Sequence, residues 1–317
     1  MSPPWGVQRK MSKAIASITD ENIPGLSAVL NPLELANYLS AVLPSTWGML
    51  GDVEVRVLKL KPGKRCTVDI ILQTTTGKHA LIGKVYAEDC SDVYRAMKQI
   101  SQAGFGAGAE FSIPQPFAYI PELQLLLQEK VHGPLAKEIF LAGGERDRTR
   151  AAERCARWLA HFQAQAPLSG RVFVLTHKRM ESWVRPLTKP NGPLADKARL
   201  LLKRLEIASA ALDRDETCAC HGAYGHHQII LTETRTATFD WDGYCVADPT
   251  WDVAQFIIKL QQLGLKSEGS RNALAAAVDC FYKIYTVTSR FKVAKRLPFY
   301  KAAHCLKQAR PIRFCCH

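Results

Sequence analysis

The chain has 317 residues, of which 47% are hydrophobic and 22% are charged. This composition is typical of a globular protein with a substantial core, and it excludes a disordered tail, a collagen-like repeat and a small disulfide scaffold. The net charge of +13 suggests an anionic partner such as a nucleotide, a nucleic acid, an acidic peptide or a membrane surface.

The excess positive charge is concentrated near the C-terminus. Between Cys280 and His317 there are nine Lys and Arg residues and no Asp or Glu, so the rest of the chain is close to neutral. We expect this basic segment to attract an acidic partner or acceptor, unless it is only a solvated face. Nucleic acid is disfavoured as a partner, because the chain lacks a helix-turn-helix signal, a zinc pattern and a basic sheet with interleaved aromatic residues.

The N-terminal residues contain no apolar stretch of the kind that a signal peptide needs, and no hydrophobic run approaches the ~18–20 residues that span a bilayer. The ten cysteines are then expected as reduced thiols, which predicts a cytoplasmic protein without a transmembrane segment. A zinc site at Cys218, Cys220 and His221 is disfavoured, because their C-x-C-H spacing lacks the paired C-x-x-C units of structural zinc sites.

Taken in chain order, residues 1–49 predict a loose arm followed by a helix. The helix is expected from Asn31 to Leu43, because Asn31 is a favourable N-cap and Pro32 suits the first helical position. In the next segment, 50–130, alternating hydrophobic residues predict strands around one helix. The strands are expected over 53–60, 66–72, 79–86, 117–119 and 123–128, and the helix over 91–103.

After Gly133 the hydrophobic residues recur at helical spacing. Helices are expected over 150–165, 194–212, 250–263 and 272–285, and two short strands over 229–231 and 236–240. The predicted fold class is therefore α+β. It consists of a small antiparallel-sheet lobe over 50–130 and a mainly helical lobe over 131–317.

The most informative stretch runs from Cys220 to Phe256. A His-Gly loop leads into the first short strand, the second strand delivers Asp240-x-Asp242, and Asp248-Pro-x-x-Asp252 opens a helix. A hairpin places the start of its first strand beside the end of its second, so Gln228 and Asp240 are expected to reach one divalent cation. Phosphoryl transfer needs such side-chain oxygens to hold a metal against phosphates.

This stretch resembles the aminoglycoside phosphotransferase and choline kinase-like family, which has the two-lobed protein-kinase-like fold. His221-Gly222, Asp240-x-Asp242 and Asp248-Pro-x-x-Asp252 match the family pattern at the expected spacing. Two positions depart from it. Ala223 stands where the family has its catalytic Asp, and Gln228 stands where it has a metal-binding Asn.

The resemblance extends to the sheet lobe and implies the residues that bind the cofactors. Lys84 would hold the α- and β-phosphates, Lys64 lies in the hairpin that covers the phosphates, and the backbone at Glu129 and Val131 would meet the adenine. Magnesium would be held by Gln228, Asp240 and Asp242. Catalytic roles are implied for Lys84, His221, Asp240 and Asp242, with Asp242 taking a second metal or assisting the acceptor.

The sequence indicates a partner for Asp252 but not for Lys84. In kinase-like proteins the Lys pairs with a Glu on the following helix, but the segment 91–103 contains Asp92 and no Glu, so the partner of Lys84 is unassigned. Asp252 is expected as a buried carboxylate that accepts hydrogen bonds from the His221 loop and holds its shape.

The function that the resemblance implies is transfer of the γ-phosphoryl group of ATP, or of another nucleoside triphosphate, to a hydroxyl of a small molecule or peptide, with Mg²⁺ as cofactor. Ala223 leaves three alternatives. The chain is an active enzyme with a substitute group such as Asp242, His226 or His227, a pseudokinase that binds nucleotide as a scaffold or regulator, or an engineered inactive form.

Overall fold

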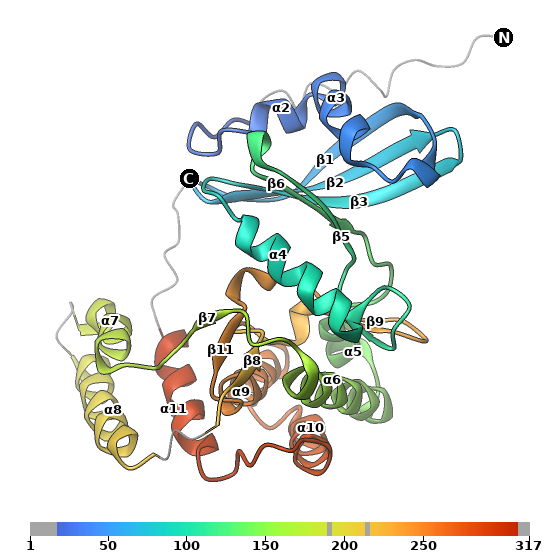
Figure 1. Ribbon diagram of the computed structural model, residues 1–317. Helices are drawn as coiled ribbons and strands as arrows, with labels where there is room; N and C mark the ends of the chain where they lie inside the picture. Colours follow the sequence, from blue (N-terminus) through green and yellow to red (C-terminus); the bar gives the residue numbers. More distant parts are fainter. Residues whose placement is uncertain (1–17, 189–191, 213–215, 310–317) are drawn as a thin grey trace. The chain divides into compact units, whose positions relative to one another are not determined.

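The computed structural model describes residues 18–188, 192–212 and 216–309. It confirms an α+β fold (Figure 1). The chain divides into two compact units, the first formed by residues 1–107 and 113–131 and the second by residues 108–112 and 132–317. Some of the predicted features lie outside the described residues. They are the start of the N-terminal arm, the charges of Arg310 and Arg313, and the cysteines that follow them.

The first unit contains a five-stranded antiparallel sheet with the order β1-β2-β3-β6-β5. Its strands are β1 (Leu50–Lys61), β2 (Arg65–Thr74), β3 (Gly77–Tyr86), β5 (Pro116–Ile120) and β6 (Leu125–Glu129). Its helices are α2 (Leu26–Leu30), α3 (Pro32–Val42) and α4 (Ser91–Ile100), with short turns at Ser45–Trp47, Ser101–Phe105 and Pro121–Leu123. All five predicted strands are therefore confirmed, each within a few residues of its expected ends.

Alternation along the strands places the core of this unit. Cys66, Val68, Ile70 and Leu72 of β2 are fully buried, as expected for one face of a pleated strand. They belong to one hydrophobic cluster with residues of α2 and α3, so both helices pack on this face of the sheet. The predicted cap of α3 is also confirmed, because the side chain of Asn31 accepts hydrogen bonds from the N–H groups of Leu33 and Glu34.

One buried carboxylate holds the end of β6 to the sheet. Asp69 of β2 is 3% exposed, and its two oxygens accept hydrogen bonds of 2.8 and 2.9 Å from Lys130 Nζ. Arg56 Nη2 lies 3.2 Å from the same carboxylate. These contacts fix the segment directly after β6, where the nucleotide base is expected.

We expect Asp69→Asn to lower the free energy of unfolding by about 1–3 kcal/mol, because it breaks a hydrogen-bonded pair around a buried charge. Urea unfolding of the variant and the parent measures this difference. Asp52→Asn is the matched control, since Asp52 is an exposed acid on the neighbouring strand β1. Equal losses of stability in the two variants would contradict this role for Asp69.

The second unit contains two small sheets, β4-β10-β9 and β7-β11-β8. The strands are β4 (Phe111–Ser112), β7 (Arg171–Val172), β8 (Cys218–Cys220), β9 (Ile229–Leu231), β10 (Thr236–Thr238) and β11 (Cys245–Ala247). The helices are α5 (Ala136–Ala142), α6 (Glu145–Gln165), α7 (His177–Thr188), α8 (Pro193–Ala210), α9 (Thr250–Glu268), α10 (Ala275–Thr288) and α11 (Leu297–Gln308). Single 3-10 turns, η4 and η5, lie at His226–Gln228 and Trp241–Gly243.

Aromatic packing supports the loops of this unit. Trp158 and Phe162 of α6 stack on each other with ring centroids 5.0 Å apart, and Trp158 also stacks on Tyr224 at 5.5 Å. The ring of Trp241 lies 5.2 Å from Phe162 and 4.7 Å from His221. The aromatic residues beside His221 and Asp240, Tyr224 and Trp241, thus both pack against α6. Within the described residues, no helix is both long and apolar enough to cross a membrane.

Candidate functional site

The loop that follows β8 is held by one carboxylate from α9. The N–H of His221 donates a hydrogen bond of 2.6 Å to Asp252 Oδ2, and the N–H of Gly222 donates one of 3.0 Å to Oδ1. Asp252 is fully buried, and burial raises its pKa to about 6 although both N–H donors oppose the shift. The expectation that Asp252 shapes this loop is therefore confirmed.

His221 itself is fully buried, and its Nε2 lies 3.0 Å from the carbonyl oxygen of Phe239. The ring thus ties the loop to the segment between β10 and η5. Gly222 is also required here. Its φ of +74° suits glycine, and a Cβ at this position would lie 1.9 Å from the carbonyl oxygen of Gly243. The loop and the turn that carries Asp242 are consequently in direct contact.

Ala223, at the position of the missing Asp, has an unexpected neighbour. Lys259 of α9 donates a hydrogen bond of 2.5 Å from Nζ to the carbonyl oxygen of Ala223. Burial, and then the charge of Lys307, lower the pKa of Lys259 to about 7, while Asp252 and Asp240 oppose the shift. Sequence reasoning missed Lys259, because a lysine within a helix is usually solvated and nothing in its neighbours marks it.

Gln228 and Asp240 lie together, as the hairpin argument predicted. Gln228 is 4% exposed and its Nε2 donates to Asp240 Oδ2 at 3.4 Å. Its buried Oε1 accepts no hydrogen bond from any residue that the structure describes. Asp240 adopts a left-handed backbone conformation with a φ of +73°, which is uncommon for a residue other than glycine and is typical of functional turns.

This pair fits a magnesium ion. Mg²⁺ is bound in nucleotide enzymes by one or two protein oxygens together with phosphates, and the unsatisfied Gln228 Oε1 beside the Asp240 carboxylate supplies two such oxygens. Asp242 is exposed in η5. In the described ranges no three His, Cys, Asp or Glu residues form a group that could hold a metal ion.

The residues expected to bind the nucleotide all belong to the first unit. Lys84 is 4% exposed and lies between Thr67 of β2 and Leu126 of β6 in the sheet register. The preceding Gly83 has no room for a side chain, because a Cβ would lie 2.8 Å from Val68 Cγ2. Lys84 itself points to the opposite face of β3 from the core, since successive side chains alternate.

The turn and the strand end that flank this position are also ordered. Lys64 is exposed in the β1–β2 turn, and its carbonyl accepts a hydrogen bond of 2.8 Å from the N–H of Ala87. At the end of β6, the N–H of Glu129 donates to the carbonyl of Gln115 at 2.8 Å, and the Gln115 N–H donates to Glu129 Oε2 at 3.0 Å. Val131, two residues later, is partly exposed.

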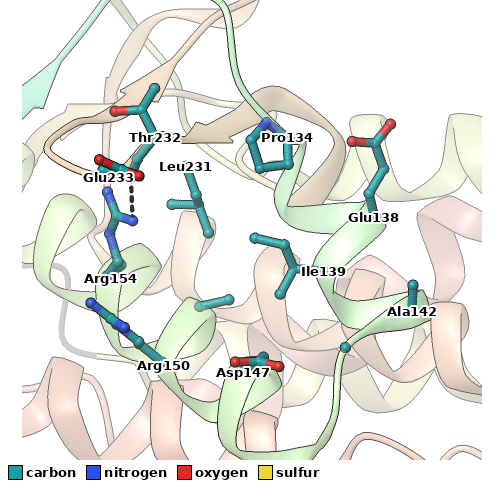
Figure 2. A pocket seen from close by; sticks show the side chains of 12 residues that line it. Pro134, Glu138, Ile139, Ala142, Asp147, Arg150, Arg154, Leu231, Thr232 and Glu233 are labelled. Atoms are coloured by element: carbon teal, nitrogen blue, oxygen red, sulfur yellow. Dashed lines mark hydrogen bonds between the residues drawn. The ribbon is translucent and has the colours of Figure 1, made fainter.

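The described part of the second unit contains sizeable cavities. One of about 860 Å³ lies between α5, the start of α6 and the β9–β10 turn. Figure 2 shows Arg150 and Arg154 on one side of it and Glu138 and Ile139 of α5 on the other. Arg154 is occupied in holding the turn, since it donates to the carbonyl of Thr232 at 2.7 Å. None of the predicted site residues lines this cavity.

Another cavity, of about 530 Å³, adjoins the His221 loop. We call it the basic pocket. It is lined by Lys137 and Leu141 of α5, His226 and His227 of η4, Gln262, Leu263, Lys266 and Ser267 of α9, Gln308 of α11, and Lys259, which also bonds Ala223.

Part of the C-terminal positive charge is used internally. Arg296 lies 3.2 Å from Asp248 and 3.5 Å from Glu216 in ion pairs. Lys307 Nζ lies 4.8 Å from the centre of the Trp251 ring, in a cation–π contact. These two of the nine basic residues therefore stabilise the second unit, and the prediction of an acidic partner at this segment rests on fewer charges than the sequence suggested.

Comparisons with known proteins identify solved structures with the same fold and a matching family. Solved structures with the same fold include a choline/ethanolamine kinase family protein from Mesorhizobium loti, with 18% identity, a TM-score of 0.55, and coverage of 87% of this chain and 83% of the other. An aminoglycoside-3'-phosphotransferase of type VIII has 17% identity, a TM-score of 0.54, and coverage of 85% and 97%. An amicoumacin kinase in complex with AMP-PNP and Ca²⁺ has 12% identity, a TM-score of 0.53, and coverage of 80% and 79%.

A search of curated proteins gives no match to this sequence. The model of the phosphotransferase enzyme family, however, matches residues 71–276. This range is well over half of the chain and includes Lys84, the His221 loop and the Gln228–Asp240 pair. The chain therefore belongs to the phosphotransferase enzyme family.

Proposed function

We propose that this protein transfers the γ-phosphoryl group of ATP, or of another nucleoside triphosphate, to a hydroxyl of a small molecule or peptide. The observation that carries the proposal is the contact of buried Gln228 with partly buried Asp240, beside a loop that Asp252 holds in shape. Lys84 would bind the α- and β-phosphates, and Glu129 and Val131 would bind the base. The free thiols of the described cysteines are compatible with action in the cytoplasm.

Gln228 and Asp240 would hold Mg²⁺, with Asp242 as a further ligand or a partner of the acceptor. When bound, the ion would neutralise negative charge on the phosphates. His221 and Asp252 position the loop at which the acceptor hydroxyl would meet the phosphoryl group. Phosphoryl transfer depends mainly on positioning and charge stabilisation, so the methyl group of Ala223 slows transfer without removing the rest of this machinery.

A second candidate function is that of a nucleotide-binding pseudokinase. Ala223 favours it, since its methyl group can neither accept a proton nor orient a hydroxyl. The carbonyl oxygen of Ala223 already accepts a hydrogen bond from Lys259. This candidate differs from the first only in turnover. Nucleotide binding without phosphate transfer, over a broad screen of acceptors, would favour it.

Nucleotide binding is tested by thermal unfolding with and without ATP and Mg²⁺. We expect ATP with Mg²⁺ at about 100 times its dissociation constant to stabilise the parent by about 2.7 kcal/mol. Lys84→Ala and Asp240→Ala should each lose most of this stabilisation, because the first removes the positive charge expected at the phosphates and the second removes a carboxylate expected to hold Mg²⁺.

Lys78→Ala is the matched control, since Lys78 is an exposed lysine on the same strand β3, and it should keep the full shift. Absence of any nucleotide-dependent stabilisation in the parent would overturn both candidate functions.

A further inference from the structure

The side chains that line the basic pocket bring only positive charge to it. Its titratable side chains are Lys137, Lys259, Lys266, His226 and His227, and among the residues that the structure describes no Asp or Glu lines it. A concave surface with charge of one sign concentrates the field and raises the local concentration of ions of opposite charge. The pocket is therefore built for an anion and against a cation.

An independent feature of the pocket is an unsatisfied buried nitrogen. His226 is 7% exposed, and its Nδ1 has no hydrogen-bond partner among the residues described. A neutral imidazole ring offers one donor and one acceptor. Buried polar groups in native proteins are normally satisfied, and His226 lines the pocket, so a ligand that reached its ring would supply the missing partner.

The position of the pocket relates it to the proposed reaction. Lys259 lines the pocket and also donates to the carbonyl of Ala223, so an anion there would lie next to the loop expected to meet the acceptor. His226 and His227 belong to the turn that also carries Gln228. Lys259 and the turn η4 thus belong both to the lining of the pocket and to the site already described.

We propose that the basic pocket binds the anionic group, a phosphate or a carboxylate, of the acceptor alcohol. This inference rests on the proposed function. In the reaction the bond from the γ-phosphorus to the bridging oxygen breaks, a bond to the acceptor oxygen forms, and ADP, a phosphate ester and the hydroxyl proton are the products. Lys137, Lys259 and Lys266 neutralise the anionic group, and a polycationic acceptor is rejected by the same charges.

The test measures binding of inorganic phosphate, malonate and spermidine to the full chain by calorimetry without nucleotide, at fixed ionic strength. We expect the two anions to bind and spermidine not to bind. A phosphate preference assigns a phosphorylated acceptor and a malonate preference a carboxylated one. The double variant Lys137→Glu/Lys266→Glu should weaken anion binding at least tenfold, since both side chains are exposed at the pocket and tolerate charge reversal.

The matched control is Lys178→Glu/Lys203→Glu, which makes the same change in net charge at exposed lysines of α7 and α8. It should bind the anions like the parent. Equal weakening in both double variants, or spermidine binding in the parent, would overturn the proposal. Because no nucleotide is present, loss of anion binding is separate from failure of the ATP-dependent stabilisation, which tests the proposed function alone.

Discussion

Replacing Ala223 by aspartate is expected to raise turnover of ATP at least tenfold, with water as the acceptor. A positioned general base contributes about 10²–10⁴ to such a reaction, and the residue at position 223 follows the His-Gly pair on a loop fixed by Asp252. The new carboxylate would lie on the loop whose carbonyl Lys259 already contacts. Release of phosphate from ATP and Mg²⁺ measures the gain.

Ala223→Asn is the control for this change. It has nearly the size of aspartate but accepts no proton, so its turnover should stay at the parent's level. Ala223 is half-buried, and both variants should retain the ATP-dependent stabilisation. A gain in the asparagine variant equal to that in the aspartate variant would contradict a general-base role at this position. Unchanged turnover in a nucleotide-binding Ala223→Asp variant would assign the chain to the pseudokinases.

The sheet of the first unit could be predicted well because its signals are local. Alternating residues from Cys66 to Leu72 and the tight turns at Pro62-Gly63 and Thr76-Gly77 indicate the three strands β1, β2 and β3 and their antiparallel pairing. The His221 loop and the Asp240 turn were also predictable. There the residue types and their spacing indicate the binding of a divalent cation for phosphoryl transfer, and the hairpin brings Gln228 to Asp240.

Other elements gave too little signal. Strands β7, β8 and β11 have two or three residues each, which is too short for a period to be recognised. Helix α7 contains Pro186, and a proline usually ends a predicted helix. The parallel pairing of β4 with β10 joins segments far apart in the sequence, so no local pattern could indicate it.

Lys259 shows why the site itself was only partly predictable. Its contact with the Ala223 carbonyl joins α9 to a loop 36 residues earlier in the chain. The position depends on how α9 packs beneath the loop, and Asp252, on the same helix, fixes that packing through its two hydrogen bonds. The spacing of Asp252 in the sequence indicates its role, whereas no pattern in the sequence indicates the role of Lys259, two helical turns later.

Asp252→Ala is expected to be among the most destabilising single changes in the second unit. It removes the acceptor of two N–H groups, from His221 and Gly222, inside a buried region. Each buried donor left unsatisfied costs about 1–3 kcal/mol. Part of this loss is offset because burial of the carboxylate is itself unfavourable, as the raised pKa of Asp252 shows. Urea unfolding at neutral pH measures the net loss.

Two further variants show whether this loss comes from the hydrogen bonds. Asp252→Asn keeps one acceptor oxygen, so it should satisfy one of the two N–H groups and lose less stability than Asp252→Ala. Asp279→Asn changes an exposed acid on α10 and should leave stability within about 0.5 kcal/mol of the parent. If alanine and asparagine at position 252 were equally and only slightly destabilising, the loop would be held by its aromatic contacts, and Asp252 would not be the residue that positions His221 and Ala223.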